Sequence, residues 1–312
     1  MKRQFRIKIL LFLSLCIVTS EVFSRSLNGF NLDKSLIPNE EILQGGPPKD
    51  GIPALDNPKF LAASDAKYLN DNDYVLGINL NGKSKAYPIR ILNWHEVVND
   101  HIGEFQFVVT YCPLCGSGMV FEAKVNNINL KFGVSGLLYN SDVLLYDKES
   151  LSLWSQIKSQ AISGKFRGVQ LKNIPIQQTT WRDWREKHPD TKVLSVDTSY
   201  QRDYATNPYA GYQNSNQLYF PVKFRAKGYH PKEQVIALAL NGHAKAWPFV
   251  ELGKSNGLVK DKFAGKTIAV KFNKKNRSAI VVDETGRLLP ATTLYWFAWY
   301  AFYPETAVYS AD

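Results

Sequence analysis

The feature of this sequence that most constrains its fold is a hairpin pattern that occurs twice. Residues 75–88 (VLGINLNGKSKAYP) align with residues 235–248 (VIALALNGHAKAWP). In each copy an apolar, β-rich run leads to Asn-Gly and then to a second short run, and Asn-Gly tolerates the positive φ angles of a type I′ turn. Each copy is therefore predicted to be a β-hairpin, and the chain is predicted to contain two sequence-related units.

The similarity between the two copies weakens after the hairpins and ends at a pair of cysteines. Residues 102–109 correspond loosely to residues 263–270, but the second copy has residues 272–275 (FNKK) where the first has Cys112 and Cys115. We interpret the first copy as the one that holds the site and the second as its scaffold, because the residues that are lost are potential ligands. The alternative is that duplicated units drift apart without functional meaning.

These patterns divide the chain into four segments. Residues 1–24 have basic residues before a short apolar run, which is typical of a signal peptide. Residues 25–65 are polar with several Gly and Pro residues, which indicates an extended N-terminal arm. We assign residues 66–200 to a first unit that carries the Cys/His site, and residues 201–312 to a second, degenerate unit packed on the first.

The predicted signal peptide implies an exported protein, located in the periplasm or outside the cell. Its apolar run, residues 9–18, is too short to span a bilayer comfortably, and no later stretch is long enough, so no transmembrane segment is expected after signal removal. Residues 294–303 are rich in aromatic side chains but are better suited to a buried helix. Cys16 falls inside the signal peptide, which leaves Cys112 and Cys115 as the cysteines of the mature chain.

Charge and composition argue against several classes of partner. Of the formal net charge of +10, residues 1–24 carry +3, and the +7 that remains is spread out with no run of five basic residues. A diffuse positive charge on an exported chain does not favour binding to nucleic acid. No glycine-rich phosphate-binding loop is present, so no nucleotide cofactor is expected. The partner is left open as a small molecule, a metal or a protein.

The remaining patterns indicate many strands and few helices. Apolar residues at helical spacing predict a short helix over residues 89–99, and residues 180–189 form a capped helix that ends at a proline. Most other segments resemble strands. We predict an α+β fold with largely antiparallel sheets and short helices, built on the two sequence-related units.

The cysteine pair offers the most reactive chemistry in the mature chain. Cys112-Pro113-Leu114-Cys115-Gly116 follows a predicted strand. Outside the cytoplasm a CxxC pair fits a structural disulfide, a redox dithiol or a metal clip. A thioredoxin-type pair lies at the start of a helix, which stabilises the thiolate. Here strand-like residues 119–121 follow instead, so the turn resembles the metal-binding knuckle of rubredoxins and zinc ribbons.

A metal held by two thiolates needs further ligands. His95 with the two cysteines suits Zn²⁺, whereas the thioether of Met119 suits Cu(I), so copper or zinc is the expected metal. His101 is a further candidate. The alternative is that neither side chain binds a metal, so that His95 is a core or capping residue and Met119 packs in the hydrophobic core.

Three polar residues near the cysteines are candidates for catalysis, namely Glu96, Ser135 and Asp142. The last two belong to a Gly-rich segment, residues 133–142, which is predicted to be a loop between strands that could line a pocket. An ordinary turn would use the same residue types for their backbone tolerance. No spacing supports a Ser135/His95/Asp142 triad.

Several of these motifs occur in the same order in a known bacterial family. The chain closely resembles the uncharacterised family called domain of unknown function 3179 over roughly residues 45–305, and the motifs that carry the resemblance are residues 87–100, 111–116, 132–142 and 152–156. The resemblance implies an exported single-module protein and brings no established activity. It also implies that His95, Glu96, Cys112, Cys115 and residues 135–142 belong to one signature.

The favoured hypothesis is an exported protein with a thiolate-based metal site, copper or zinc, at the CxxC and the nearby His95. One alternative is a thiol–disulfide oxidoreductase in which His95 or Glu96 moves protons. Another is a non-catalytic binding or scaffold module in which a disulfide between Cys112 and Cys115 staples the turn. Whether the protein is an enzyme stays open on these patterns.

Overall fold

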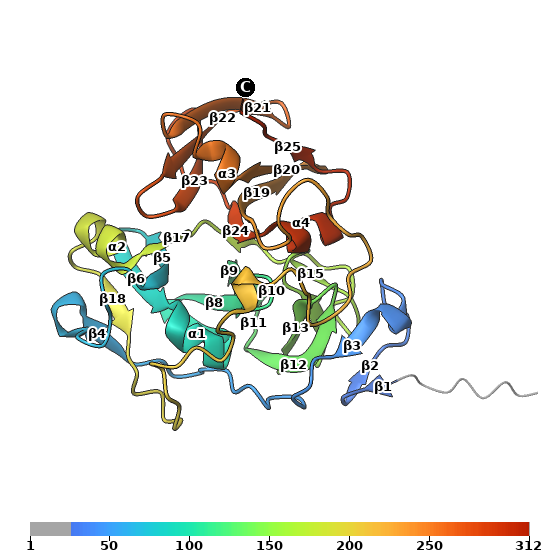
Figure 1. The fold of residues 1–312 in the computed structure, drawn as a ribbon. Coiled ribbons are helices and arrows are strands. Elements are labelled where there is room, and N and C mark those ends of the chain that lie inside the picture. The colour runs from blue at the N-terminus through green and yellow to red at the C-terminus, as the bar shows by residue number, and fades with distance from the viewer. Residues whose placement is uncertain (1–25, 312) are drawn as a thin grey trace, which may run out of the picture.

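The computed structural model describes residues 26–311 and has a β-propeller fold. Strands make up 41% of the structure and helices 12%, and five sheets form the blades of a five-bladed propeller (Figure 1). The prediction of an α+β fold built on two units is therefore wrong. The predicted signal peptide, residues 1–24, and Cys16 lie outside the described residues.

The error has a physical origin in the length of the helices. The α-helices of the described residues are α1 (Ile89–His95), α2 (Trp181–Lys187), α3 (Phe249–Leu252) and α4 (Trp296–Phe302). Each begins directly after a strand and has at most seven residues. Helices of that length cannot cover a sheet as a separate layer, which an α+β architecture requires. Among residues 26–311, no helix has the length and apolar character needed to cross a membrane.

Blades 1 to 3 are built from strands that lie between residues 42 and 194. Blade 1 has the strand order β17 (Gln177–Thr180), β5 (Tyr74–Leu80), β6 (Lys83–Pro88), β18 (Lys192–Leu194), β4 (Phe60–Ala62). Blade 2 has the order β16 (Asn173–Ile174), β9 (Ser117–Glu122), β8 (Phe105–Cys112), β7 (Val97–Ile102). Blade 3 has the order β15 (Gln160–Ala161), β14 (Leu153–Ser155), β13 (Asp142–Asp147), β12 (Phe132–Tyr139), β3 (Ile42–Gln44).

The other two blades come from the C-terminal part of the chain. Blade 4 has the order β24 (Thr292–Tyr295), β19 (Gln234–Leu240), β20 (His243–Pro248), β25 (Ala307–Val308). Blade 5 has the order β21 (Leu258–Phe263), β22 (Lys266–Asn273), β23 (Ser278–Asp283). The two remaining sheets are two-stranded and pair β1 (Ser26–Leu27) with β2 (Phe30–Asn31), and β10 (Lys124–Val125) with β11 (Ile128–Asn129).

Both predicted Asn-Gly hairpins are confirmed. Asn81 and Asn241 have φ angles of 53° and 52°, and the glycine after each also has a positive φ, as a two-residue type I′ turn requires. The hairpins β5–β6 and β19–β20 occupy corresponding places in blades 1 and 4. Each is followed by a short helix and then by three antiparallel strands that belong to blade 2 or blade 5.

The helix predicted over residues 89–99 is shorter than expected. It ends at His95 because Glu96 has a left-handed backbone with φ 57°, and its N–H still bonds to the carbonyl of Leu92. The β-branched residues Val97 and Val98 then begin β7. The reversal at Glu96 directs the chain from blade 1 into blade 2.

The segment predicted as an N-terminal arm contributes to two blades. Within residues 26–65, β3 pairs with β12 at the edge of blade 3, and β4 pairs with β18 at the edge of blade 1. Between them Leu55 forms a bridge with Val98, donating to Val97 O and accepting from Asn99 N. The segment thus links blade 3 to blade 1 along the sheet edges.

Replacing Gly77 with alanine is expected to lower the free energy of unfolding by about 3 kcal/mol. A Cβ on Gly77 in β5 would lie 2.3 Å from the buried ring of Trp184, so the ring would have to move. The matched control is A237G at the corresponding position of β19, where loss of a methyl group in a strand costs about 1 kcal/mol. Urea unfolding measures both. If G77A lowers the free energy of unfolding no more than A237G does, the close packing of Trp184 against Gly77 is contradicted.

Candidate metal centre

A tight turn between β8 and β9 places two thiols side by side. Cys112 ends β8 and pairs with Ser117, the first residue of β9. Within the turn, Cys115 N donates to Cys112 O at 3.2 Å, and Gly116 has a φ of 61°. Tyr295 N of blade 4 donates to Cys115 O at 2.8 Å and anchors the turn from the neighbouring blade. The strand–turn–strand setting predicted for the CxxC is confirmed.

The third side chain of the site, the carboxylate of Asp142, comes from blade 3. Asn140 and Ser141, with φ angles of 52° and 65°, form the turn that leads into Asp142 at the start of β13. Asp142 is completely buried, and its Oδ2 accepts from Ile157 N at 3.1 Å. Its Oδ1 is buried and accepts no hydrogen bond from an N–H or O–H group within residues 26–311.

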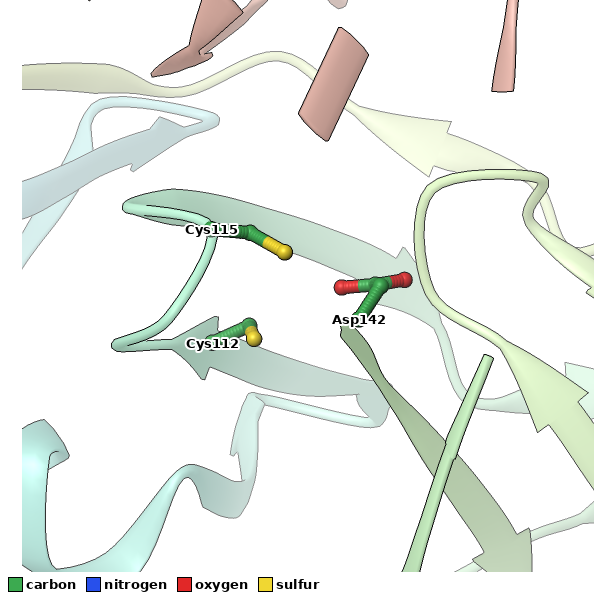
Figure 2. A group of neighbouring side chains, drawn as sticks. All are labelled: Cys112, Cys115 and Asp142. Carbon is green, nitrogen blue, oxygen red and sulfur yellow. The ribbon is translucent and has the colours of Figure 1, made fainter. Parts of the chain in front are cut away.

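These three side chains form a compact cluster. One ligand atom each from Cys112, Cys115 and Asp142 lies within 4.8 Å of the other two, so the cluster could hold a metal ion. Figure 2 shows the two cysteines at either end of the turn, with their sulfur atoms on the side where the carboxylate of Asp142 lies. Both cysteines are free thiols, with Sγ of Cys112 3.8 Å and Sγ of Cys115 3.4 Å from the carbonyl oxygen of Ser141.

Burial dominates the electrostatics of this site. It raises the pKa of both thiols above their ordinary values, and it raises the pKa of Asp142 to about 7. The pKa of Glu96 rises to about 8 through burial and through the charge of Asp142. No lysine or arginine among residues 26–311 forms an ion pair with either carboxylate. The site therefore holds several buried acids and no protein cation to balance them.

Comparison with known proteins places the chain in a family. It matches the family described as "Protein of unknown function (DUF3179)" over residues 49–306, which is most of its length. This chain belongs to the DUF3179 family. No curated protein and no solved structure matches it. The family resemblance seen in the motifs is confirmed, and it assigns no activity.

In this DUF3179 chain His95 bonds to groups outside the cysteine cluster. Its Nδ1 lies 2.8 Å from Pro53 O, and its Nε2 lies 2.6 Å from the hydroxyl of Tyr204. Its ring also packs against that of Tyr200. Burial lowers the pKa of His95, which favours the neutral imidazole. Both ring nitrogens are thus occupied, and Asp142 holds the position beside the sulfurs that was expected for His95.

The other predicted ligands and catalytic candidates are also located. Met119 lies in β9 and is buried in the same apolar cluster as both cysteines. His101 is exposed on β7. Glu96 is 7% exposed; after burial, the charge of Asp142 raises the pKa of Glu96, and the charge of Glu96 in turn contributes to the raised pKa of Cys112. Among these residues, Glu96 is the one whose chemistry is coupled to the cluster.

Ser135 has a structural role in blade 3. Residues 132–139 form strand β12, so the loop predicted over residues 133–142 is wrong apart from its final turn. A β-bulge between Val134 and Leu137 explains the glycine there, because Gly136 has a φ of 73°. The Ser135 hydroxyl donates to Leu144 O and accepts from Leu137 N, which stabilises the bulge. It is therefore not a free nucleophile.

Sequence reasoning missed the tyrosines that surround the cysteines. Tyr209 and Tyr212 belong to the segment after β18, and both have a pKa that is raised by burial and then by the nearby acidic groups. The hydroxyl of Tyr212 is buried and has no hydrogen-bond partner among the residues that the structure describes. No spacing in the sequence connects this segment to the CxxC turn about 100 residues earlier.

Proposed function

We propose that the protein binds a divalent metal ion, with Zn²⁺ as the best match, through Cys112, Cys115 and Asp142. The observation that carries this proposal is the buried carboxylate of Asp142, which has one oxygen within 4.8 Å of both sulfurs and whose Oδ1 accepts no hydrogen bond from an N–H or O–H group of the described residues. A buried carboxylate oxygen without a donor is costly. A cation at this point would bond to that oxygen and to both thiolates.

Charge and ligand type favour a divalent ion over Cu(I). The three ligands carry three negative charges when ionised, so a divalent cation neutralises more of the buried charge than a monovalent one. Cu(I) prefers thiolate and thioether ligands, whereas Zn²⁺ accepts a carboxylate beside thiolates. Three protein ligands also leave a position for water or for a substrate, which distinguishes reactive zinc sites from closed structural ones.

Glu96 is the side chain that would exchange protons next to such a centre. Its pKa of about 8 reflects burial and the charge of Asp142, and a cation bound at Asp142 would offset the second of these causes. We propose it as the general base or acid of any reaction at the open position, because a catalytic group works best with a pKa near the working pH.

The thiol–disulfide oxidoreductase alternative has less support. The cysteines are 2% and 0% exposed, so the sulfur of a partner protein has no direct path to them. Their raised pKa also lowers the fraction of the thiolate, which is the attacking species. The disulfide-stapled scaffold requires a bond between two residues that are free thiols in this structure.

The test of the proposal is a metal titration of the reduced, chelator-treated protein. We expect binding of one Zn²⁺ per chain, and we expect Co²⁺ at the same site to give a thiolate-to-metal charge-transfer band that Zn²⁺ abolishes. Titration with Cu(I) alongside decides between the two metals. Protein that retains neither Zn²⁺ nor Co²⁺ after dialysis would rule the proposal out.

We also propose that this centre operates outside the cytoplasm, as the predicted signal peptide indicates. A bound metal would then protect the two thiols from oxidation, since a coordinated thiolate is less available to form a disulfide. Cell fractionation with N-terminal sequencing is the measurement. Recovery of the full-length chain in the cytoplasmic fraction would refute export.

A further inference from the structure

A second polar site borders the cysteine turn, where residues of four blades meet. It is a pocket of about 370 Å³ whose walls include Gln178 of blade 1, Tyr111 of blade 2, Tyr295 of blade 4 and Arg277 of blade 5. Gly116 of the turn forms part of its wall. We call it the four-blade pocket. It contains none of the three proposed metal ligands, so it is a separate feature of the molecule.

Arg277 provides a cation that has no ion-pair partner in the described part of the chain. It lies in the turn between β22 and β23, and Tyr74 of blade 1 fixes this turn by donating from its hydroxyl to Asn276 O at 3.0 Å. Asn276 N in turn donates to the side chain of Asn273 at 3.0 Å. Within residues 26–311, Arg277 forms no ion pair. Its guanidinium can therefore bind an oxyanion through two parallel hydrogen bonds.

Gln178 provides an acceptor that needs a hydrogen-bond donor. It lies on β17 and is 8% exposed, yet its Oε1 is buried and has no hydrogen-bond partner within the described chain. An amide oxygen can accept two hydrogen bonds, and native structures rarely leave a buried one without any. A turn of the side-chain amide would bring this oxygen to the pocket, and a ligand that fits should then carry a hydroxyl or another donor beside its anionic group.

A second cation in the wall adds to the positive character of the pocket. Lys232 is 5% exposed, and its Nζ donates to the carbonyls of Ser215 and Gln217 and lies 4.0 Å from the centre of the Tyr212 ring. It has no carboxylate partner within the described part of the chain. Glu233 also lines the pocket, but its Oε1 accepts from Val250 N at 2.9 Å. The two cations outnumber this single acid.

We infer that the four-blade pocket binds a small hydroxycarboxylate. The carboxylate lies against Arg277, the charge of Lys232 adds to the attraction, and the ligand hydroxyl donates to Oε1 of Gln178. Tyr111 and Tyr295 supply aromatic walls, which suit the carbon chain between the two polar ends. This inference goes beyond metal binding and does not depend on it.

The test uses two pairs of acids that differ by one hydroxyl group, malate with succinate and lactate with propionate. Calorimetric titration of the full chain is expected to show that at least one hydroxy acid binds and that it binds about tenfold more tightly than its partner without the hydroxyl. R277Q should weaken that binding by at least about tenfold, because it removes the charged hydrogen bonds. Q178M should abolish the preference for the hydroxy acid.

The matched control is K275Q, which removes an exposed positive charge from the same turn without changing the pocket lining. It should bind the hydroxy acid as the unmodified protein does. The same titration with C112S distinguishes this inference from the metal proposal, since hydroxy-acid binding should persist there. The inference is overturned if no hydroxy acid binds up to ~10 mM, if R277Q and K275Q behave alike, or if neither pair shows a preference.

Discussion

Serine in place of Cys112 is expected to weaken Zn²⁺ binding by roughly 10²–10³-fold. Structural zinc sites bind with about 10–16 kcal/mol of free energy, so each of four ligands accounts for about 2.5–4 kcal/mol. Cys112 is almost completely buried and lies within 4.8 Å of the other two ligand atoms, so a shorter, weaker serine ligand has little room to adjust. Competition with a chromophoric chelator measures the affinity.

The companion variants separate the possible third ligands. C115S should match C112S, and D142N should weaken binding less, because its amide oxygen can still face the metal while the charge is lost. M119L conserves volume and H95Q conserves hydrogen bonding, so both should bind Zn²⁺ normally if Asp142 is the third ligand. If H95Q is folded by circular dichroism and loses as much Zn²⁺ affinity as C112S, His95 and not Asp142 is the third ligand.

The features that the sequence predicted well are local ones. The Asn81–Gly82 and Asn241–Gly242 turns depend on two adjacent residues that accept positive φ, and both hairpins formed as expected. The cysteine turn was similarly predictable, because a strand on each side limits where the two thiols can point. The helix at residues 181–187 was recognisable from its cap, since Thr180 accepts from Asp183 N.

The propeller and the completed site depend on contacts between distant segments. Blade 1 pairs β5 with β17 about 100 residues later, and blade 3 takes its edge strand β3 from the N-terminal segment. No periodicity reports such pairings. In the same way Asp142 reaches the cysteines because the turn before β13 meets the turn after β8 from a different blade. Residue type alone pointed to His95, whose nitrogens are occupied elsewhere.

The second large effect concerns pH. The metal-free protein is expected to lose about 2–4 kcal/mol of unfolding free energy between pH 5 and pH 8 through Glu96. Burial and the charge of Asp142 raise the pKa of Glu96 from 4.5 to about 8, so over this range the folded state binds more protons than the unfolded state. Stability is then fully present below about pH 4.5 and falls as pH rises, by up to about 1.4 kcal/mol per pH unit.

The variant E96Q should remove the part of the slope that comes from Glu96, because a neutral amide has no proton to lose, and at pH 8 it should be more stable than the unmodified protein. The part that comes from Asp142, whose pKa is raised to about 7, should remain. Urea unfolding of chelator-treated protein at several pH values measures the effect, with E104Q at an exposed position as the matched control. Saturating Zn²⁺ should reverse the slope, since the metal-bound cysteines have lost protons that the unfolded chain still holds in this pH range. Equal slopes for E96Q and E104Q would show that the pKa of Glu96 is not raised in the folded protein.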